Sequence, residues 1–417
     1  MPAVYASVDL GGTNIKCLLA TEDGSVLGSQ SVPTQSHEGP RKVLDRMAAL
    51  VGELCRQTQS RPQAMGIAVP GLVDRNRGLT KFLPNLPTQW RDVPVRDILA
   101  PKVGCPVYLL NDVRTATLGE LCFGHGRTAG TMAFFALGTG IGGGVAVDGR
   151  LRLGPLGAAG ELGHQTILPD GPRCGCGNQG CLETLASGPA IAAEGIRLMH
   201  SGLAPKLYEL VEGDASRVTT KELAQAAAAG DANVKDAIVR AARYLGIGVA
   251  NVVVVLHPEL VVLGGGVAQI GELLFETVRQ TVRQRVGMFP TDNVAILPSA
   301  LGDNAGALGG IALAMKGGLL EEDSGFGVQR LGIRTPHWRK CLIRSSKRSL
   351  AGPLPLNPDR PSVSNSRSPG MMLSDTKLGR FSTTSGGVLR TEVPVPLLCF
   401  ALENTQEQRR GTGTSLG

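Results

Sequence analysis

Residues 131–149, TMAFFALGTGIGGGVAVDG, carry the clearest architectural signal in the chain. An apolar run, a glycine-rich turn and a second apolar run together predict a β-hairpin. Shorter versions of this pattern occur at residues 4–20, VYASVDLGGTNIKCLLA, and at residues 259–266, ELVVLGGG. Glycine lets backbone N–H groups converge on an anion with no Cβ in the way, so three such loops favour a cradle for nucleotide phosphates.

Two better-known nucleotide motifs do not fit the second glycine loop. Gly138, Gly140 and Gly143 match G-x-G-x-x-G, and Glu161 follows 18 residues after the last glycine. That dinucleotide fingerprint needs a helix directly after the glycines, whereas VAVDG is typical of a strand. The sequence also contains no GxxxxGK[ST], which excludes a P-loop. The remaining interpretation is a phosphate-binding hairpin.

The order of predicted elements is typical of an α/β protein with two lobes. Strands are predicted at 4–10, 15–20, 25–33, 64–70 and 106–112, with a helix over 41–58. A second block adds the hairpin of 131–149, strands at ELVVL and NVAIL, and helices over 186–200, 219–229, 231–256, 271–286 and 304–316. We expect a first lobe over 1–115, onto which the last helix packs back, and a larger second lobe over 116–303.

Composition separates a globular part from a C-terminal tail. The 417 residues are 42% hydrophobic and 18% charged, which excludes collagen, coiled coils and wholly disordered chains. Residues 321–417 hold 14 basic and 8 acidic residues, 12 Ser and 8 Pro, whereas the other 320 residues are nearly neutral, with 28 basic and 27 acidic. We therefore predict a disordered basic tail over 319–417 and no nucleic-acid partner for the folded part.

No membrane or secretion signal is predicted. The longest apolar stretch, 244–256, has 13 residues, short of the roughly 20 that a span needs. The N-terminus MPAVYASVDLGG lacks a charged segment followed by an apolar one, so we expect a cytoplasmic protein. Nine cysteines, an odd number, argue against a disulfide framework in such a chain.

Four potential metal ligands lie within 18 residues of one another: His164, Cys174, Cys176 and Cys181. Three thiolates and one imidazole complete a tetrahedral Zn²⁺ shell and leave no position for water, which favours a structural metal. The alternatives are a redox pair or three unrelated thiols. Glu161 and Glu183 flank this segment, and each carboxylate could accept hydrogen bonds from vicinal sugar hydroxyls. The alternative for both is surface charge.

The segment PVYLLNDVRTATLGE ends a predicted strand at Asn111-Asp112 and opens a helix. Phosphoryl transfer to an alcohol needs a carboxylate that orients the hydroxyl and takes its proton. An Asp at the carboxyl end of a strand fits this role. The alternative is that Asp112 is only the N-cap of the helix.

These motifs resemble known families. DLGGTNIK resembles the sugar kinase, hexokinase and actin-like ATPase superfold. GELGHQTI and CGCGNQGCLETLASG resemble the ROK family, as do, in order along residues 3–316, AVPGLVD, PNLPTQW, the Asn-Asp pair, GTGIGGG, VVLGGGV and LGDNAGALGGIALA. The resemblance implies the two-lobed actin-like or hexokinase-type ATPase fold, ATP-dependent sugar phosphorylation with Mg²⁺, a structural Zn²⁺ and a homodimer.

The resemblance also implies roles for individual residues. Asp112 is implied as the general base, and Asp9 as a neighbour of the metal-bound phosphates. The residues implied to face the sugar are Asn85, Asn111, Asp112, Glu161, His164 and Glu183, with His164 also a zinc ligand. Those implied to face the nucleotide are Gly11, Gly12, Thr13, Lys16, Gly138, Thr139, Gly140, Gly264, Gly265 and Gly266.

The resemblance favours a glucokinase that makes glucose 6-phosphate. The alternatives are a kinase for fructose, N-acetylmannosamine or N-acetylglucosamine, or a sugar-responsive regulator. Family regulators carry a helix-turn-helix before the first glycine loop, and here the first strand starts within about three residues of the N-terminus. The family often has Ala-Asn after the Asn-Asp pair, where this chain has Val113-Arg114, a difference that bears on the sugar preference.

Overall fold

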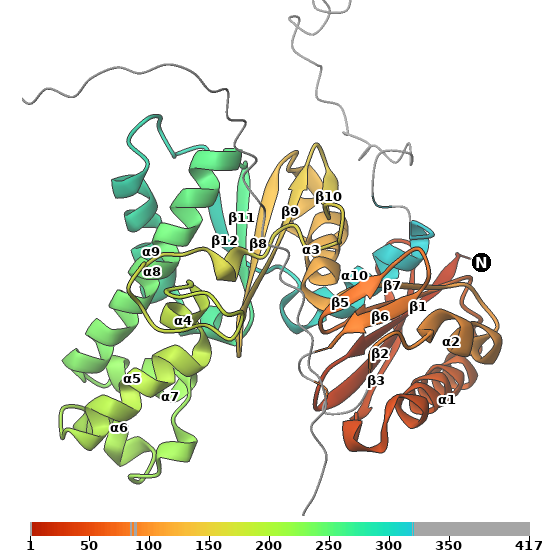
Figure 1. Cartoon of the computed structure of the whole chain (residues 1–417), viewed down its shortest axis with the longest axis horizontal. Helices are drawn as coiled ribbons and strands as arrows, with labels where there is room; N and C mark the ends of the chain where they lie inside the picture. The colour runs from red at the N-terminus through yellow and green to blue at the C-terminus, as the bar shows by residue number, and fades with distance from the viewer. Residues whose placement is uncertain (1, 84–85, 87–89, 319, 321–417) are drawn as a thin grey trace, which may run out of the picture. The chain divides into compact units, whose positions relative to one another are not determined.

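The computed structural model of the chain describes residues 2–83, 86, 90–318 and 320 (Figure 1). All of these fall within residues 1–335, the first of the two compact units into which the chain divides. Two expectations therefore concern residues outside the described part: the sugar contact of Asn85, and the tail over 319–417 apart from Leu320.

The first sheet has five strands in the order β3-β2-β1-β4-β7. They are β1 (Val4–Leu10), β2 (Asn14–Thr21), β3 (Val26–Pro33), β4 (Met65–Val69) and β7 (Val107–Asn111). β2 is antiparallel to β1 and β3, whereas β1, β4 and β7 are parallel. Helix α1 (Pro40–Thr58) packs on β2 and β3 and helix α2 (Val95–Val103) on β7. The carboxyl ends of three parallel strands therefore meet at one edge of this sheet.

The second sheet repeats this arrangement in the order β10-β9-β8-β11-β12. Its strands are β8 (Met132–Leu137), β9 (Ile141–Val147), β10 (Arg150–Arg152), β11 (Leu260–Gly264) and β12 (Ala295–Pro298). Again two antiparallel strands are followed by three parallel ones. The helices after the hairpin are α4 (Glu183–Ala186), α5 (Gly188–His200), α6 (Pro205–Leu210), α7 (Thr220–Ala228), α8 (Ala232–Leu256) and α9 (Glu272–Arg285). The predicted hairpin at 131–149 is therefore β8–β9, and its glycines lead into a strand and not into a helix.

Glycines of the run 142–144 serve packing within β9. A Cβ on Gly142 would lie 2.5 Å from Val113 Cγ2, and one on Gly144 would lie 2.1 Å from Thr117 Oγ1. Both partners belong to helix α3 (Asp112–Phe123), which begins at the end of β7. Glycine is needed because any Cβ would push this helix away from the strand. The first turns of α3 are thus held against the second hairpin.

The last helix, α10 (Ala305–Met315), also uses glycines for close contact. It packs on β1, β4 and α3. A Cβ on Gly309 would lie 1.7 Å from the Thr115 carbonyl oxygen, and one on Gly310 would lie 2.0 Å from Ser7 Oγ. The segment GALGG therefore lets α10 touch the sheet on one side and α3 on the other.

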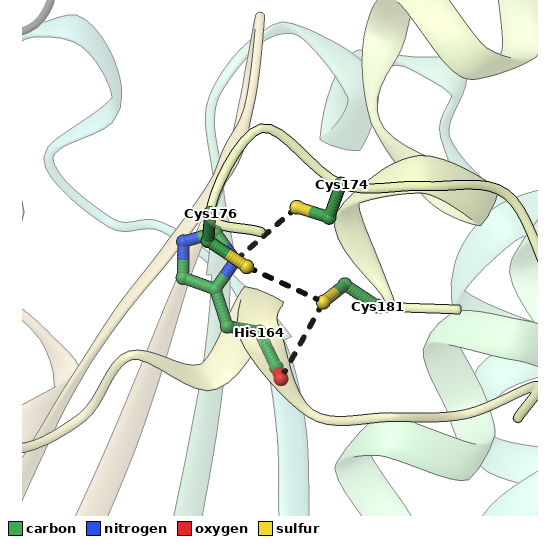
Figure 2. A group of neighbouring side chains, drawn as sticks. All are labelled: His164, Cys174, Cys176 and Cys181. Atoms are coloured by element: carbon green, nitrogen blue, oxygen red, sulfur yellow. Dashed lines mark hydrogen bonds between the residues drawn. The ribbon is translucent and has the colours of Figure 1, made fainter. Parts of the chain in front are cut away.

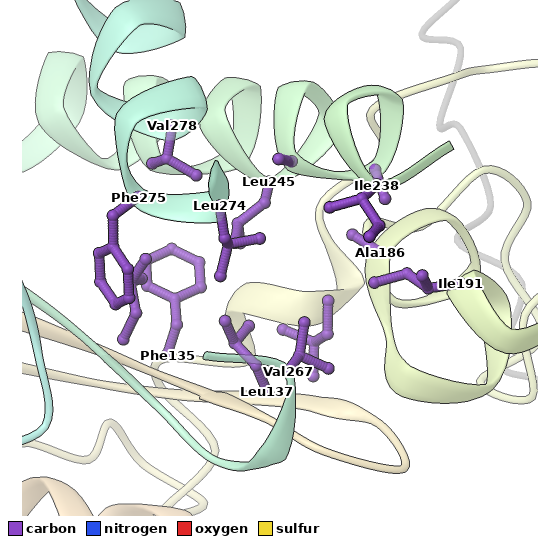
Figure 3. Packing of buried hydrophobic residues seen from close by; sticks show 14 of the residues in the cluster. Phe135, Leu137, Ala186, Ile191, Ile238, Leu245, Val267, Leu274, Phe275 and Val278 are labelled. Carbon is purple, nitrogen blue, oxygen red and sulfur yellow. The ribbon is translucent and has the colours of Figure 1, made fainter. Parts of the chain in front are cut away.

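The largest core cluster lies between the second sheet and its helices. Figure 3 shows Phe135 and Leu137 of β8 facing Leu245 of α8 and Leu274 and Val278 of α9. By length and composition α8 alone among the described helices would suffice to cross a membrane, and 56% of its most apolar window is buried inside the structure. Its burial against α9 is what a core helix requires.

Several short elements were not predicted. They are the hairpin of β5 (Leu72–Asp74) and β6 (Leu79–Phe82), helices α2, α4 and α6, and strand β10. Each has between three and nine residues, too few to show a clear period in sequence.

Candidate functional site

Two acidic residues come to the same edge of the first sheet. In the strand register Asp9 of β1 lies beside Ala68 of β4, and Val69 of β4 lies beside Asn111 of β7. Asp112 follows directly as the first residue of α3. The negative charge of Asp112 raises the pKa of Asp9, which places the two carboxylates within electrostatic reach of each other.

Asp112 is not the N-cap of its helix. Asn111 is, because its Oδ1 accepts hydrogen bonds from the backbone N–H groups of Val113 and Arg114 at 3.1 and 3.2 Å. The Asp112 carboxylate accepts from the Asn111 amide and from the Val113 N–H, both at 2.8 Å to Oδ1. Burial raises the pKa of Asp112, against the Val113 hydrogen bond and the Arg114 charge, which lower it. The alternative interpretation of Asp112 as a cap is therefore wrong, and its other oxygen stays available.

Asp9 is a half-buried carboxylate whose pKa is affected by the negative charge of Asp112. Burial, followed by the charge of Asp112, raises its pKa to about 6, and Lys16 lowers it. A Cβ on Gly306, in the first turn of α10, would lie 2.7 Å from Asp9 Oδ2. Lys16 Nζ itself donates to Asn304 Oδ1 at 2.7 Å and to the Asp303 carbonyl at 3.3 Å, just before that helix. The negative charge of this carboxylate is offset only in part by Lys16, so the position is suited to contact with a cation.

The second and third glycine loops have open space beside Gly138 and Gly266. In the first loop, the Gly11 N–H donates to Asn14 O at 2.9 Å and Thr34 donates to the Gly11 and Thr13 carbonyls, both at 2.7 Å. Beside Gly138 and Gly266 no described atom lies within 4 Å of a built Cβ position. Gly265 has φ +88° and a Cβ there would lie 2.4 Å from Leu137 O, the residue before Gly138. The second and third loops therefore adjoin each other.

Glu161 lies in an ion pair with Arg114. Arg114 Nη2 donates to Glu161 Oε1 at 2.7 Å, and the Glu161 side chain remains 42% exposed. Arg114 belongs to the first turn of α3, two residues after Asp112, so this pair joins the Glu161 segment to the helix that carries Asp112.

Glu183 contacts the second hairpin and the Cys/His cluster. Its Oε2 accepts from the Ile141 N–H at 2.9 Å, and its Oε1 lies 3.7 Å from Cys174 Sγ. A Cβ on Gly140 would lie 2.4 Å from Glu183 Oε2. The structure therefore places Glu183 against the turn of β8–β9, whereas the family resemblance implies that it contacts the sugar.

The four predicted metal ligands come together (Figure 2). The ligand atoms of His164, Cys174, Cys176 and Cys181 all lie within 4.8 Å of one another. His164 Nδ1 is 3.6 Å from Cys174 Sγ, and Cys176 Sγ is 3.8 Å from Cys181 Sγ. Zinc–sulfur bonds of about 2.3 Å at tetrahedral angles put two ligand sulfurs about 3.8 Å apart. The spacing of these donors therefore fits a single Zn²⁺.

At two of the three cysteines in this cluster the environment disfavours a free thiolate. Burial raises the pKa of Cys174 to about 12 and also raises that of Cys181, whereas a hydrogen bond from the Asn178 backbone lowers that of Cys176. A bound cation would deprotonate all three thiols, since the thiolate is the ligand. Asn178 Nδ2 also lies 3.5 Å from Cys181 Sγ, where its N–H can donate to a thiolate and hold it in place.

A cavity of about 980 Å³ lies next to the Arg114–Glu161 pair. Its lining includes Asp74, Arg75 and Lys81 of the β5–β6 hairpin region, and Arg152 and Ala159 from the segment after β9. Ala159 links this cavity to the Arg114–Glu161 pair, because its carbonyl accepts hydrogen bonds from Arg114.

Two groups that shape the site were missed in the sequence. Arg114 was noted only as a departure from a family pattern. Glu120 of α3 is fully buried, and its Oε1 accepts from the Leu301 N–H at 3.0 Å and from Ser299. These bonds join α3 to the segment that precedes α10, which Lys16 also contacts. A buried Glu or Arg carries no local sequence signal, since its partner lies 47 residues away for Arg114 and about 180 for Glu120.

Comparison with known proteins agrees with this geometry. A model of the ROK family matches residues 5–317. The chain is 37% identical over 312 residues to a glucokinase of Thermotoga maritima, across 73% of this chain and 95% of that protein. It is 32% identical over 311 residues to a xylose repressor of Caldicellulosiruptor bescii, across 74% of this chain and 77% of that protein.

One solved structure that it resembles is that of a ROK family glucokinase from Streptomyces griseus in complex with glucose and AMPPNP. The TM-score is 0.66 at 33% identity, with 75% of this chain and 100% of that chain covered. The expected α/β fold is thereby confirmed for the described residues.

Proposed function

Because the chain belongs to the ROK family, we propose that it transfers the γ-phosphoryl group of ATP to a hydroxyl of a hexose. Glucose is the first candidate, since the relative with 37% identity is a glucokinase and the similar solved structure holds glucose and AMPPNP. The product would then be glucose 6-phosphate.

The observation that carries this proposal is the position of Asp112. It is a half-buried carboxylate at the carboxyl end of a parallel strand, it does not cap its helix, and desolvation raises its pKa. Asp112 would take the proton of the sugar hydroxyl while the hydroxyl oxygen bonds to the γ-phosphorus. The bond from that phosphorus to the β-phosphate oxygen breaks, and ADP leaves.

The phosphates of ATP are proposed to lie against the glycine loops. Gly138, Thr139 and Gly140 form the turn of β8–β9, and Gly264–Gly266 adjoin it. Gly11, Gly12, Thr13 and Lys16 would cover the phosphates from the other hairpin, with Asp9 beside them. Mg²⁺ bound with ATP would offset the negative charge of the phosphates. The half-buried, weakly paired Asp9 fits a place next to that cation.

For the sugar, Asn111, Glu161, His164 and Glu183 remain the proposed contacts, with unequal support from their geometry. Glu161 is half exposed and keeps one free carboxylate oxygen. Asn111 is engaged by capping and by a 3.1 Å bond to Gly71 O, so it supports the site through backbone geometry. His164 offers its second ring nitrogen, because Nδ1 faces Cys174.

Zn²⁺ is proposed as a structural ion held by His164, Cys174, Cys176 and Cys181. Four protein ligands leave no bound water to activate, so the ion would fix the loop and take no part in phosphoryl transfer. A homodimer is also proposed, by the family resemblance, and light scattering of the purified chain would test it.

A sugar-responsive regulator is the second candidate, favoured by the 32% identity to a xylose repressor. The two candidates separate in a coupled ADP-release screen over glucose, mannose, fructose, xylose and the N-acetylhexosamines, run alongside a gel-shift assay. Turnover with one or more hexoses supports the kinase. Sugar-dependent DNA binding with no turnover would replace it by the regulator.

A further inference from the structure

The Arg114 side chain is almost completely buried, with 2% of it exposed. It lies in the first turn of α3, two residues after the proposed general base Asp112. A buried guanidinium is costly unless its charge is paired and its N–H groups are hydrogen-bonded. The position of its partners therefore shows what the buried charge holds in place.

Most of those partners belong to one short segment. Nη2 donates to Glu161 Oε1 at 2.7 Å and to Ala158 O at 3.0 Å. Nε and Nη2 donate to Ala159 O at 3.2 and 3.1 Å. The remaining bond runs from Nη1 to Asn111 Oδ1, the atom that caps α3, at 3.1 Å. One planar side chain thus joins the start of α3 to the backbone and the carboxylate of residues 158–161.

We propose that Arg114 is the positioning residue of the sugar site. It fixes residues 158–161 against α3, so that Glu161 and Asp112 contact the same hexose in a fixed geometry. The inference rests on the proposed sugar kinase function. Because Arg114 occupies Oε1, Glu161 would accept a sugar hydroxyl through Oε2.

The rigid fork of arginine suits this task better than a lysine would. Two donors aimed at neighbouring acceptors set the plane of the segment as well as its distance. The charge of Arg114 also lowers the pKa of Asp112, against the larger effect of burial, which raises it. Arg114 therefore serves both carboxylates without itself contacting the sugar.

The test compares Arg114→Gln with Arg114→Lys, with Arg279→Gln as the matched control. Arg279 also combines an ion pair, to Glu272, with hydrogen bonds to a backbone carbonyl, that of Ile296, but it lies on α9 away from the proposed site. We expect R114Q to raise the sugar KM and the calorimetric sugar Kd at least about tenfold, a change of about 1.4 kcal/mol. The ATP KM should stay within about threefold, and R114K should bind sugar with intermediate affinity.

Replacing a residue that only supports the fold would lower the melting temperature and change the sugar KM and the ATP KM together. We expect R279Q to show these effects weakly at most. A second test is the double variant R114Q E161Q. Because Arg114 acts through Glu161, the sugar Kd of the double variant should be close to that of Glu161→Gln alone. Additive losses of affinity would overturn the proposal. Unchanged sugar affinity in R114Q, with the fold intact, would overturn it as well.

The outcomes keep the two proposals apart. If the parent chain binds glucose in calorimetry but turns over no hexose, the kinase proposal fails and the Arg114 proposal is still decided by the Kd values of the variants. If the parent turns over glucose and R114Q has the parent's sugar KM, the kinase stands and the role of Arg114 falls. If the parent binds none of the tested sugars, the Arg114 proposal is overturned with the sugar site.

Discussion

Replacing Asp9 with asparagine should stabilise the protein at neutral pH while it abolishes phosphoryl transfer. Asp9 lies half-buried at the end of β1, and desolvation and the negative charge of Asp112 raise its pKa to about 6 because both disfavour its ionised form. At pH 7 the folded protein therefore carries an ionised group in a place that prefers a neutral one. The asparagine side chain is similar in shape to the aspartate and is uncharged at every pH.

The magnitude follows from the pKa. A rise from 3.8 to about 6 corresponds to about 3 kcal/mol of destabilisation when the group is fully ionised. That figure is an upper bound, since an asparagine amide in the same place also loses hydration, which costs about 1–2 kcal/mol. We expect a gain of about 1–2 kcal/mol for D9N, or a rise in melting temperature of about 2–4 °C.

The sign of the pH dependence is fixed by the direction of the shift. Because the folded pKa of Asp9 lies above its unfolded value of 3.8, its contribution to stability is complete below about pH 4 and is lost as pH rises through about 6. The stability of D9N relative to the parent should therefore be lowest near pH 4, rise up to about pH 6 and stay level above that.

Thermal unfolding between pH 4.5 and 8, without nucleotide or magnesium, measures this difference. The matched control is Asp23→Asn in the turn between β2 and β3, where hydrogen bonds from Thr21 and Ser25 lower the pKa to about 2. That variant should lose stability at neutral pH. If D9N and the parent unfold in parallel across the whole pH range, or if D9N is less stable at pH 8, Asp9 is not held in the unfavourable ionised state described here.

Three further changes test the remaining roles. Asp112→Asn should lower kcat by about 10²–10⁴ while the sugar KM changes little, since asparagine can orient a hydroxyl but not take its proton; a kcat within about threefold of the parent would contradict this. Cys176→Ala should lose zinc by elemental analysis and raise the KM for ATP as well as for sugar, and a parent protein that contains no zinc would refute the metal site. A chain truncated after residue 320 should keep its turnover and melting temperature, because the family match ends at residue 317; an insoluble truncated protein would show that the remainder is needed.

Much of the fold could be predicted because its strands and long helices have a clear period. The helix predicted over 41–58 is α1, Pro40–Thr58, and the one predicted over 304–316 is α10, Ala305–Met315. What the sequence did not reveal is why the glycines are there. Gly142 in a strand and Gly309 in a helix both leave room for α3. Only the packing of α3 in the folded protein distinguishes this role of a glycine from phosphate binding.

For the site, local motifs were informative and distant pairings were not. The four ligands around Cys176 lie in one short segment, so their spacing alone predicted the cluster that the structure brings together. Asn111 and Asp112 are adjacent and chemically similar, so sequence could not tell which of them caps α3. The Arg114–Glu161 pair joins residues 47 apart, and no periodicity reports a contact of that kind.

Glu183 connects the Cys/His cluster to the β8–β9 hairpin. Its two carboxylate oxygens point to different parts of the site, one to the Ile141 N–H in β9 and one toward Cys174. With a metal bound, Cys174 is a thiolate and no longer donates to Glu183, so the ion would hold Glu183 through Cys181, two residues before it, and Glu183 in turn holds the backbone directly after Gly140. An ion with no role in the chemistry would thus help to set the turn against which the phosphates of ATP are proposed to lie. This is the reason to expect that loss of zinc weakens nucleotide binding together with sugar binding.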